Sequence, residues 1–315
     1  MRHLLSIEDL DREAIELITS RAAAFAEVAD RPIKKVPALR GKLVVNLFYE
    51  ASTRTRSSFE LAAKRLSADV VNFQASGSSV EKGESLRDTV ATLSAYGPAV
   101  IVIRSPHAGA PALVAEWAAA AVVNAGDGKH QHPTQALLDT YTLLQHFGTE
   151  TLEGRSIWIV GDVLHSRVAR SCVQAFAMMG AAVTLCGPPT LVPEELRALG
   201  CEVVHSLDGM READVVYVLR MQLERMRSAY VPSLREYAAV YQVNARRLGP
   251  RQVLMHPGPV NRGVELAADV IDSPQALITD QVRSGVVVRM AVLYELLAGV
   301  RAPRPEHAAP EPQLA

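Results

Sequence analysis

Cysteine is scarce in this sequence of 315 residues, which contains three: Cys172, Cys186 and Cys201. They are odd in number, widely spaced and set in apolar runs, and no metal-ligand spacing links them. This pattern argues against a disulfide framework, and nothing else in the sequence supplies a metal site. We therefore expect buried thiols in a reducing compartment, which favours a cytoplasmic protein.

Net charge is almost absent as well, since 33 Lys and Arg residues are balanced by 34 Asp and Glu residues to a formal charge of -1. Proteins that bind nucleic acid or a membrane surface through their general charge need an extended basic field. Neither kind of partner is expected here. Any site for an anion must be local, formed by a few residues rather than by the charge of the whole chain.

Long apolar runs are missing too. The N-terminal segment carries acids where a signal peptide would have an apolar core, and no stretch is long enough to predict a transmembrane helix. Hydrophobic residues make up 49% and charged residues 21%, which is typical of a soluble globular protein. Because 315 residues exceed what one hydrophobic core usually organises, two domains are expected.

What the sequence does contain is a regular alternation of short β-branched runs with helical patterns. This alternation is typical of βαβ units around a parallel sheet and predicts an α/β fold. A long helical segment from 133 to 147, ending at Gly148, separates four such runs from five others. We therefore predict two doubly wound parallel-sheet domains joined by helices. The nine runs are 42–48, 69–73, 99–104, 121–126, 156–162, 182–187, 201–206, 213–219 and 252–257.

The domain boundary is placed within the connecting helical segment. The first domain is then 1–140 and the second 141–284, with the C-terminal helix at about 285–300 packing back on the first. The tail, 301–315, has four prolines and little to bury, so it is predicted to be disordered.

Two further helices have recognisable signals. Ser6 with Asp9 forms a capping-box pattern, which predicts a first helix from there to about Val28. The last strong helix, 280–297, carries apolar residues on one helical face and should pack on a core. Those residues are Val286, Met290, Leu293 and Leu297.

The segment 51–58 is the most unusual in composition, with five hydroxyl side chains and two arginines but no acid. It follows a predicted strand and leads into a predicted helix. The apolar positions of that helix recur at i, i+3, i+4 and i+7, which identifies its buried face. These positions are Phe59, Ala62, Ala63 and Leu66.

This placement puts Ser52 and Thr53 at the N-terminus of the helix, where unpaired backbone N–H groups and the positive end of the helix dipole converge. Such a terminus binds phosphate well, and Arg54 and Thr55 add a charged and a neutral donor. Capping of the helix by Ser52 is expected in any case, but it does not account for the whole run. The segment therefore predicts a phosphate site.

The same segment, with several others in the same order, resembles the aspartate and ornithine carbamoyltransferases. In that family a carbamoyl group moves from carbamoyl phosphate to the α-amine of an amino acid, and phosphate is released. The resemblance implies no cofactor and no metal, because carbamoyl phosphate is already activated and positioning with electrostatic stabilisation can accelerate the reaction. The matching segments are "FYEASTRTRSSFELAAKRL" (48–66), "VEKGESLRDT" (80–89), "VIRSP" (102–106), "HQHPTQALLD" (130–139), "RMQLER" (220–225) and "MHPGPVNRG" (255–263).

The resemblance assigns the binding of carbamoyl phosphate residue by residue. The phosphate cradle is matched by 52–55, with Arg54 and Thr55 also near the carbonyl oxygen. Arg104, at the end of a predicted strand, matches another anion-binding arginine. His132 matches the histidine that donates to the carbamoyl oxygen, and Gln135 matches the group that holds the carbamoyl nitrogen.

His132 is assigned a hydrogen bond to the developing oxyanion rather than the role of general base. The departing phosphate is the expected proton acceptor from the attacking amine.

The polar segment "SGSSVEKGESL" (76–86) would be an ordinary exposed loop without the resemblance. In the family this loop reaches into the active site of a neighbouring chain. Lys82 matches the lysine that does so and Ser78 the serine, with Ser79 as an alternative. A homotrimer with shared sites is thus implied, while assembly with regulatory or dihydroorotase-like chains stays open.

The acceptor implied by the resemblance is aspartate, which places the chain in de novo pyrimidine biosynthesis. Arg220 and Gln222 match the aspartate-binding pair of the family, and Arg167 matches the arginine for the α-carboxylate. Two carboxylates call for such cationic partners. Val168, where many relatives have Thr, departs from the pattern. So does Gly258, where some relatives have Leu; Gly258 and Pro259 are provisional site residues for the amine.

The motifs of the ornithine enzymes, a Ser-Met-Gly loop and a His-Cys-Leu-Pro motif, do not occur in the sequence.

Two alternatives come from other functional classes. The segment "IWIVGDVLHSRVAR" (157–170) could form the dinucleotide-binding turn of an oxidoreductase, but it has one glycine where that fingerprint has three. A catalytically inactive scaffold homologue should have lost an arginine, histidine or lysine of the signature. This chain retains Arg54, His132 and Lys82.

Overall fold

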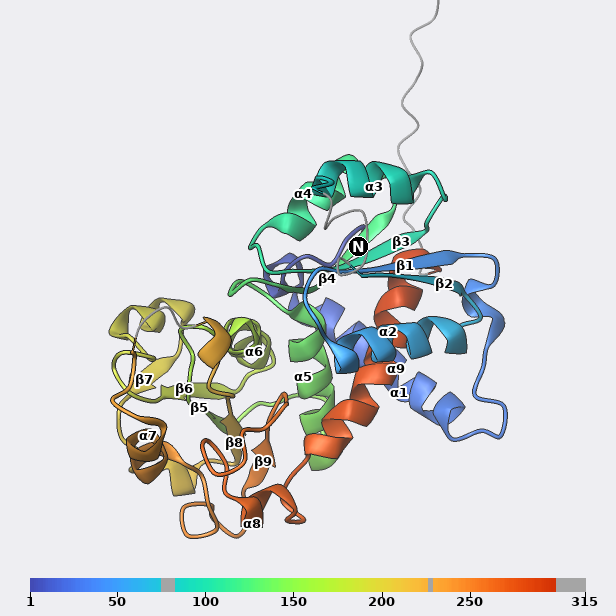
Figure 1. The fold of residues 1–315 in the computed structure, drawn as a ribbon. Helices are drawn as coiled ribbons and strands as arrows, with labels where there is room; N and C mark the ends of the chain where they lie inside the picture. Colours follow the sequence, from blue (N-terminus) through green and yellow to red (C-terminus); the bar gives the residue numbers. More distant parts are fainter. Residues whose placement is uncertain (75–82, 226–228, 299–315) are drawn as a thin grey trace, which may run out of the picture.

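Two parallel sheets organise the chain in the computed structural model, which describes residues 1–74, 83–225 and 229–298 (Figure 1). The predicted α/β fold class is confirmed. The first sheet has the order β2-β1-β3-β4, with β1 (Leu43–Phe48), β2 (Asp69–Gln74), β3 (Val100–Ser105) and β4 (Ala121–Asp127). The second has the order β7-β6-β5-β8-β9, with β5 (Ser156–Val160), β6 (Ala182–Cys186), β7 (Glu202–Val204), β8 (Val215–Val218) and β9 (Val253–Met255).

Helices connect and cover the strands. They are α1 (Arg12–Ala29), α2 (Thr53–Arg65), α3 (Leu86–Ser94), α4 (Ala110–Trp117), α5 (Pro133–Phe147), α6 (Arg167–Met178), α7 (Leu234–Tyr241), α8 (Ala268–Ile271) and α9 (Ile278–Leu297). Short 3₁₀ helices are η1 (Ile7–Asp9), η2 (Pro37–Leu39), η4 (Glu194–Leu199), η5 (Met210–Glu212) and η6 (Leu223–Arg225). None of the helices in the described segments combines the length and the apolar character needed to cross a bilayer.

The first sheet is buried on both faces, which explains its nearly continuous apolar strands. In β1, Val44 belongs to the core shared with α1, α2 and α9, whereas its neighbour Val45 belongs to a second cluster under α3 and α4. Val102 and Ile103 divide in the same way in β3, because successive side chains of a strand point to opposite faces. The helices above and below this sheet are visible in Figure 1.

The prediction of a continuous helix from Ser6 was wrong. The capping box exists, since the backbone N–H of Ser6 donates to Asp9 Oδ2 at 2.8 Å, but it closes the single turn η1. Leu10 then takes an extended conformation with φ −112° and ψ 148°. Helix α1 begins at Arg12 with its own cap, Asp11, whose side chain accepts from the N–H of Ala14 at 2.8 Å.

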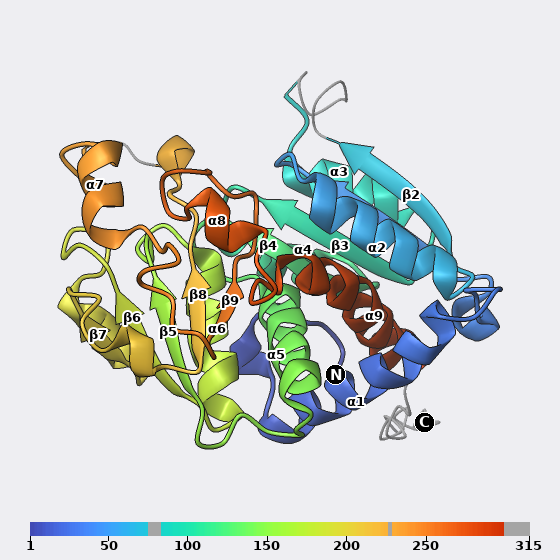
Figure 2. The same ribbon diagram turned by 90° about the horizontal axis from the view of Figure 1, so that it is seen from below.

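Helix α9 is buried more widely than one apolar stripe predicts. Met290 and Leu293 are fully buried, while Val286 and Leu297 are partly exposed at the edges of the packed surface. The reason is that α9 contacts α1, α2 and α5 together. Figure 2 shows α5 and α9 side by side between the two sheets.

The candidate site residues lie at equivalent positions in the two sheets. In each parallel sheet the strand order reverses direction, between β1 and β3 in the first and between β5 and β8 in the second. Ligands of such sheets bind outside the carboxyl ends of the strands at this point. The predicted site segments all follow strand ends of one sheet or the other.

Candidate active site

A cavity of about 620 Å³ lies where the carboxyl ends of the strands of both sheets meet. Every predicted site residue within the described segments lines it, although those residues are distributed over most of the chain. Ser78 and Lys82 lie outside the described residues. The predicted residues that line the cavity are Ser52, Thr53, Arg54, Thr55, Arg104, His132, Gln135, Arg167, Arg220, Gln222, Gly258 and Pro259.

One wall of the cavity is the N-terminus of α2. Ser52 has the extended backbone of a helix cap, with φ −158° and ψ 96°, but its side chain makes no capping hydrogen bond. The first turn of α2 contains no acidic residue that would compete for the backbone N–H groups. The Ser52 hydroxyl and the first-turn N–H groups are therefore suited to an external anion, as expected for a phosphate site.

Gly258 lies directly against the guanidinium of Arg54. A Cβ atom added at Gly258 would lie 2.7 Å from Cζ and Nη1 of Arg54, and the glycine has a left-handed backbone with φ +64°. The segment after β9 thus approaches the Arg54 side chain too closely to leave room for a Cβ atom at position 258. This contact explains why glycine, which has no side chain, suits position 258 here.

His132 is neutral in this environment. Its side chain is buried, and its Nδ1 has no hydrogen-bond partner in the described residues, while its backbone N–H donates to Ser171 Oγ at 2.9 Å. Burial lowers the pKa of His132 well below its usual range, and the nearby Arg104 and Arg167 add to this effect. A neutral imidazole can donate one hydrogen bond to a developing oxyanion.

Gln135 is held by a buried carboxylate that the sequence reasoning missed. Its Nε2 donates to Asp139 at 3.0 and 3.2 Å, which leaves its carbonyl oxygen to accept from an amide N–H of a ligand. Asp139 also accepts from the hydroxyl of Tyr217 and from Nε2 of Gln281, both at 2.7 Å. The spacing of Gln135 and Asp139 within "HPTQALLD" was the available signal, because residues four apart share a helix face.

Glu50 was also missed, although it lies in the first matching segment. Its carboxylate is 2.6 Å from Nη2 of Arg167, 3.2 Å from Nε of Arg104 and 3.7 Å from Nη2 of Arg225. Burial and, after it, the neighbouring Arg167 lower the pKa of Arg104 to about 9, while Glu50 opposes the shift. One carboxylate thus contacts three arginines that line the cavity.

The loops after β5 and β8 are joined by Asp162, another residue that the sequence reasoning missed. Its Oδ1 accepts from the backbone N–H of His165 at 3.2 Å, and its Oδ2 accepts from the backbone N–H of Gln222 at 3.1 Å. The bond holds the loop that carries Gln222 beside the start of α6, where Arg167 begins the helix. Val168, the departure from the family pattern, lines the cavity next to Arg167.

Arg289 of α9 contributes a buried cation to the cavity lining and was not predicted. It donates to Ser58 Oγ at 2.7 Å and to the carbonyl of Gly285 at 3.3 Å, and its Cζ lies 5.0 Å from the centre of the Phe59 ring. Burial lowers the pKa of Arg289 to about 10, although the nearby carboxylate of Asp139 opposes the shift. Within the described segments, no group of three or more His, Cys, Asp or Glu residues is placed to hold a metal.

Comparison with known families supports the interpretation of both halves. Residues 2–145 match the family described as aspartate/ornithine carbamoyltransferase, carbamoyl-P binding domain. Residues 153–296 match the family described as aspartate/ornithine carbamoyltransferase, Asp/Orn binding domain.

Individual proteins match over nearly the whole chain. The aspartate carbamoyltransferase catalytic subunit of Acidothermus cellulolyticus is 56% identical over 303 residues, covering 95% of this chain and 93% of that protein. The catalytic subunit of Salinispora arenicola is also 56% identical, covering 95% and 99%. Among solved structures, Trypanosoma cruzi aspartate transcarbamoylase in complex with N-(phosphonacetyl)-L-aspartic acid has a TM-score of 0.85 at 33% identity, covering 94% of this chain and 96% of that one.

Proposed function

The chain belongs to the aspartate/ornithine carbamoyltransferase family, and from this membership we propose that it transfers the carbamoyl group of carbamoyl phosphate to the α-amine of L-aspartate. The products are N-carbamoyl-L-aspartate and phosphate. The observation that carries this proposal is the single cavity that combines the N-terminus of α2 with arginines from both halves of the chain. The relatives named above support aspartate rather than ornithine as the acceptor.

Carbamoyl phosphate binds with its phosphate at the N-terminus of α2 and beside Arg104. The carbamoyl oxygen then faces Arg54, Thr55 and the neutral imidazole of His132, which stabilise the negative charge that develops on it. The amine of aspartate attacks the carbon to form the C–N bond. The C–O bond to phosphate breaks, its electron pair leaves with the phosphate oxygen, and the phosphate takes the proton from the amine.

Aspartate is held by its two carboxylates. Arg167 binds the α-carboxylate, and Arg220 with Gln222 binds the side-chain carboxylate. All three residues lie on the side of the cavity that follows the strands of the second sheet. In this arrangement residues 1–140 bind carbamoyl phosphate and residues 141–284 bind aspartate.

The proposed assembly is a homotrimer in the cytoplasm, in which Lys82 and Ser78 enter the site of a neighbouring chain. The support for this part of the proposal is the match of "VEKGESLRDT" to the family segment that does so.

The experiment is a carbamoylation assay with aspartate and ornithine as rival acceptors. We expect turnover with aspartate alone, and Arg220→Ala should raise the KM for aspartate by about tenfold to a hundredfold, the effect of losing a charged hydrogen bond. The KM for carbamoyl phosphate should change little. Equal turnover with ornithine would contradict the proposed acceptor.

Arg262→Ala serves as the matched control. Arg262 forms an exposed ion pair with Asp272 at 3.3 Å and does not line the cavity, so its loss should leave both KM values unchanged.

A further inference from the structure

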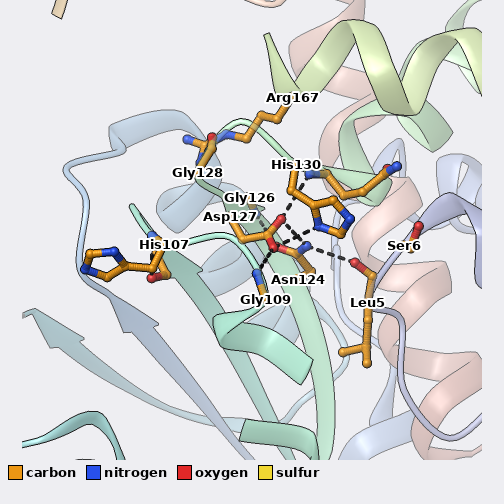
Figure 3. Close-up of polar contacts among 12 residues, drawn as sticks. Leu5, Ser6, His107, Gly109, Asn124, Gly126, Asp127, Gly128, His130 and Arg167 are labelled. Carbon is orange, nitrogen blue, oxygen red and sulfur yellow. Dashed lines mark hydrogen bonds and ion pairs between the residues drawn. The ribbon is translucent and has the colours of Figure 1, made fainter. Parts of the chain in front are cut away.

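Asp127, at the end of β4, is a buried carboxylate outside the set of residues that line the cavity. Each of its oxygens accepts two hydrogen bonds. Oδ1 accepts from Nδ2 of Asn124 at 2.8 Å and from the backbone N–H of Gln131 at 3.0 Å. Oδ2 accepts from the backbone N–H of Gly109 at 2.8 Å and lies 3.0 Å from Nδ1 of His130. Figure 3 shows the carboxylate at the centre of these contacts.

The contacts of Asp127 come from three separate segments. Gly109 precedes α4, Gln131 lies just before His132, and Asn124 belongs to β4 itself. Asn124 extends the network, since its Nδ2 also donates to the carbonyl of Leu5 at 2.8 Å and its Oδ1 accepts from the N–H of Gly126 at 2.8 Å. The side chains of Asp127 and Asn124 thus determine the path of the turn between β4 and α5.

This turn is fitted against the guanidinium of Arg167. Gly126 has φ +115°, and a Cβ atom added there would lie 2.8 Å from Nε and 2.9 Å from Cζ of Arg167. The carbonyl of Gly128 accepts from Nη1 of Arg167 at 3.3 Å. Figure 3 shows Arg167 reaching this turn from α6. On its other side, Gly128 would clash with the carbonyl of Pro106 at 2.9 Å if it carried a Cβ, so the turn has little freedom to shift.

We propose that Asp127, supported by Asn124, is a positioning residue that holds the Gly126–Gly128 turn as a rigid backing for Arg167, and so sets the affinity for the α-carboxylate of the acceptor. The inference rests on the proposed function of Arg167. Asp127 touches neither substrate; it acts through the turn. A displacement of a binding group by about 1 Å can cost about a hundredfold in rate or affinity.

A carboxylate is required at position 127 because four donors converge on it. An amide has one carbonyl oxygen and presents its NH₂ group to the remaining donors, so Asp127→Asn loses one acceptor oxygen with its two hydrogen bonds and places N–H groups against each other. Asp127→Ala leaves all four donors without the carboxylate. Both substitutions remove hydrogen bonds that fix the position of the turn, and the alanine variant removes more of them.

The test compares steady-state kinetics of the full-length wild type with Asp127→Asn and Asp127→Ala. We expect the KM for aspartate to rise by about a hundredfold in the alanine variant and less in the asparagine variant. The KM for carbamoyl phosphate should rise much less than the KM for aspartate, because its phosphate cradle is on α2. A merely structural role would lower the melting temperature without separating the two KM values.

A double-mutant cycle tests whether Asp127 affects aspartate binding through Arg167. If Asp127 acts through Arg167, then adding Asp127→Ala to Arg167→Met should raise the KM for aspartate by about twofold or less, since the group to be positioned is already gone. If Asp127→Ala does not fold, Asn124→Ala provides the second variant, with an expected rise of about tenfold. Asp214→Asn is the matched control, because Asp214 bonds Arg155 and the backbone of Ser156 away from the cavity.

The proposal is overturned if folded Asp127 or Asn124 variants keep the wild-type KM for aspartate, or if Asp127→Ala has the same effect with and without Arg167. If the wild-type protein does not carbamoylate aspartate, the proposed function itself is wrong. That result is obtained with the wild type alone, without any variant, so the two failures can be distinguished.

Discussion

The neutral state of the His132 side chain separates two possible roles for it. Because burial and neighbouring arginines lower its pKa well below 6.5, the imidazole stays neutral through the physiological range, so it has no imidazolium proton to give and is a weak general base there. Its contribution is then a hydrogen bond to the carbamoyl oxygen.

We predict that His132→Ala lowers kcat by about a hundredfold, the usual effect of losing one oxyanion donor, and keeps the basic limb of the wild-type pH profile. The measurement is kcat against pH for both proteins. His146, exposed in the last turn of the same helix, is the control, and His146→Ala should be fully active. Wild-type turnover in His132→Ala would remove His132 from the mechanism.

Gly258 offers a second test at a single residue. Gly258→Ala introduces a side chain at φ +64°, which costs about 1–2 kcal/mol, and it displaces the Arg54 guanidinium. Gly263 has a similar conformation, with φ +86°, but an added Cβ meets nothing within 4 Å. Both alanine variants should lose similar stability, whereas Gly258→Ala alone should lower kcat, by about tenfold or more. Thermal melts and kinetics together check this, and equal kcat values would show that Gly258 does not constrain Arg54.

At the scale of whole elements, Asp139 joins α5 to β8 and α9. It accepts hydrogen bonds from Gln135, Tyr217 and Gln281, yet burial raises its pKa to about 6 despite them. Burial therefore outweighs the hydrogen bonds, and the ionised carboxylate is less stable in the folded protein than in the unfolded chain, where its pKa is 3.8. The same residue orients Gln135 and links the elements around the cavity.

The raised pKa gives a stability prediction with a definite sign. An acid whose folded pKa exceeds its unfolded pKa contributes stability that is complete below about pH 4 and is lost as the pH rises through about 6. Relative to Asp139→Asn, the wild type should therefore lose up to about 3 kcal/mol of stability as the pH rises from below 4 to above 6, at about 1.36 kcal/mol per unit of pKa. Denaturant unfolding of both proteins across this range measures the difference. A difference that does not change with pH would contradict the prediction.

At the scale of the whole molecule, the cavity is formed by residues that follow the carboxyl ends of the strands in both sheets. Arg54 lies in residues 2–145, which match the carbamoyl-P binding domain, and Arg167 lies in residues 153–296, which match the Asp/Orn binding domain. The carboxylate of Glu50 joins the two parts, at 2.6 Å from Nη2 of Arg167. A further contribution from Lys82 of a neighbouring chain is part of the proposed function. It makes the assembly itself testable.

We predict that Arg54→Ala and Lys82→Ala are each nearly inactive alone. In trimers formed by random mixing of equal amounts, a site is intact only when each partner supplies its unmutated residue, which occurs at about one site in four. Unfolding, mixing and refolding the two variants should restore about a quarter of wild-type activity. If refolded wild type recovers while the hybrids stay inactive, Lys82 does not cross between chains.

Much of the architecture could be predicted from local pattern, because the signals that specify it lie within a few residues. Alternating β-branched runs marked the strands, and α5 ends at Gly148 because this glycine takes the left-handed conformation, with φ +64°. The phosphate cradle was also local, since strand, hydroxyl-rich turn and helix follow one another. The start of α1 was mistaken because a capping box specifies one turn, and the extended Leu10 then interrupts the helix.

The sequence by itself determined which residues were able to bind anions, but only the tertiary structure decided how those groups are balanced and held. Nothing in the sequence around Glu50 indicates its contacts with three arginines. The hydrogen bonds that Asp139 accepts from Tyr217 and Gln281 likewise come from other elements of the fold. The need for glycine at position 126 is visible only in the structure, where the guanidinium of Arg167 packs against it. Burial and charge pairing depend on neighbours far away along the chain, and a pattern within a few residues carries no record of those neighbours.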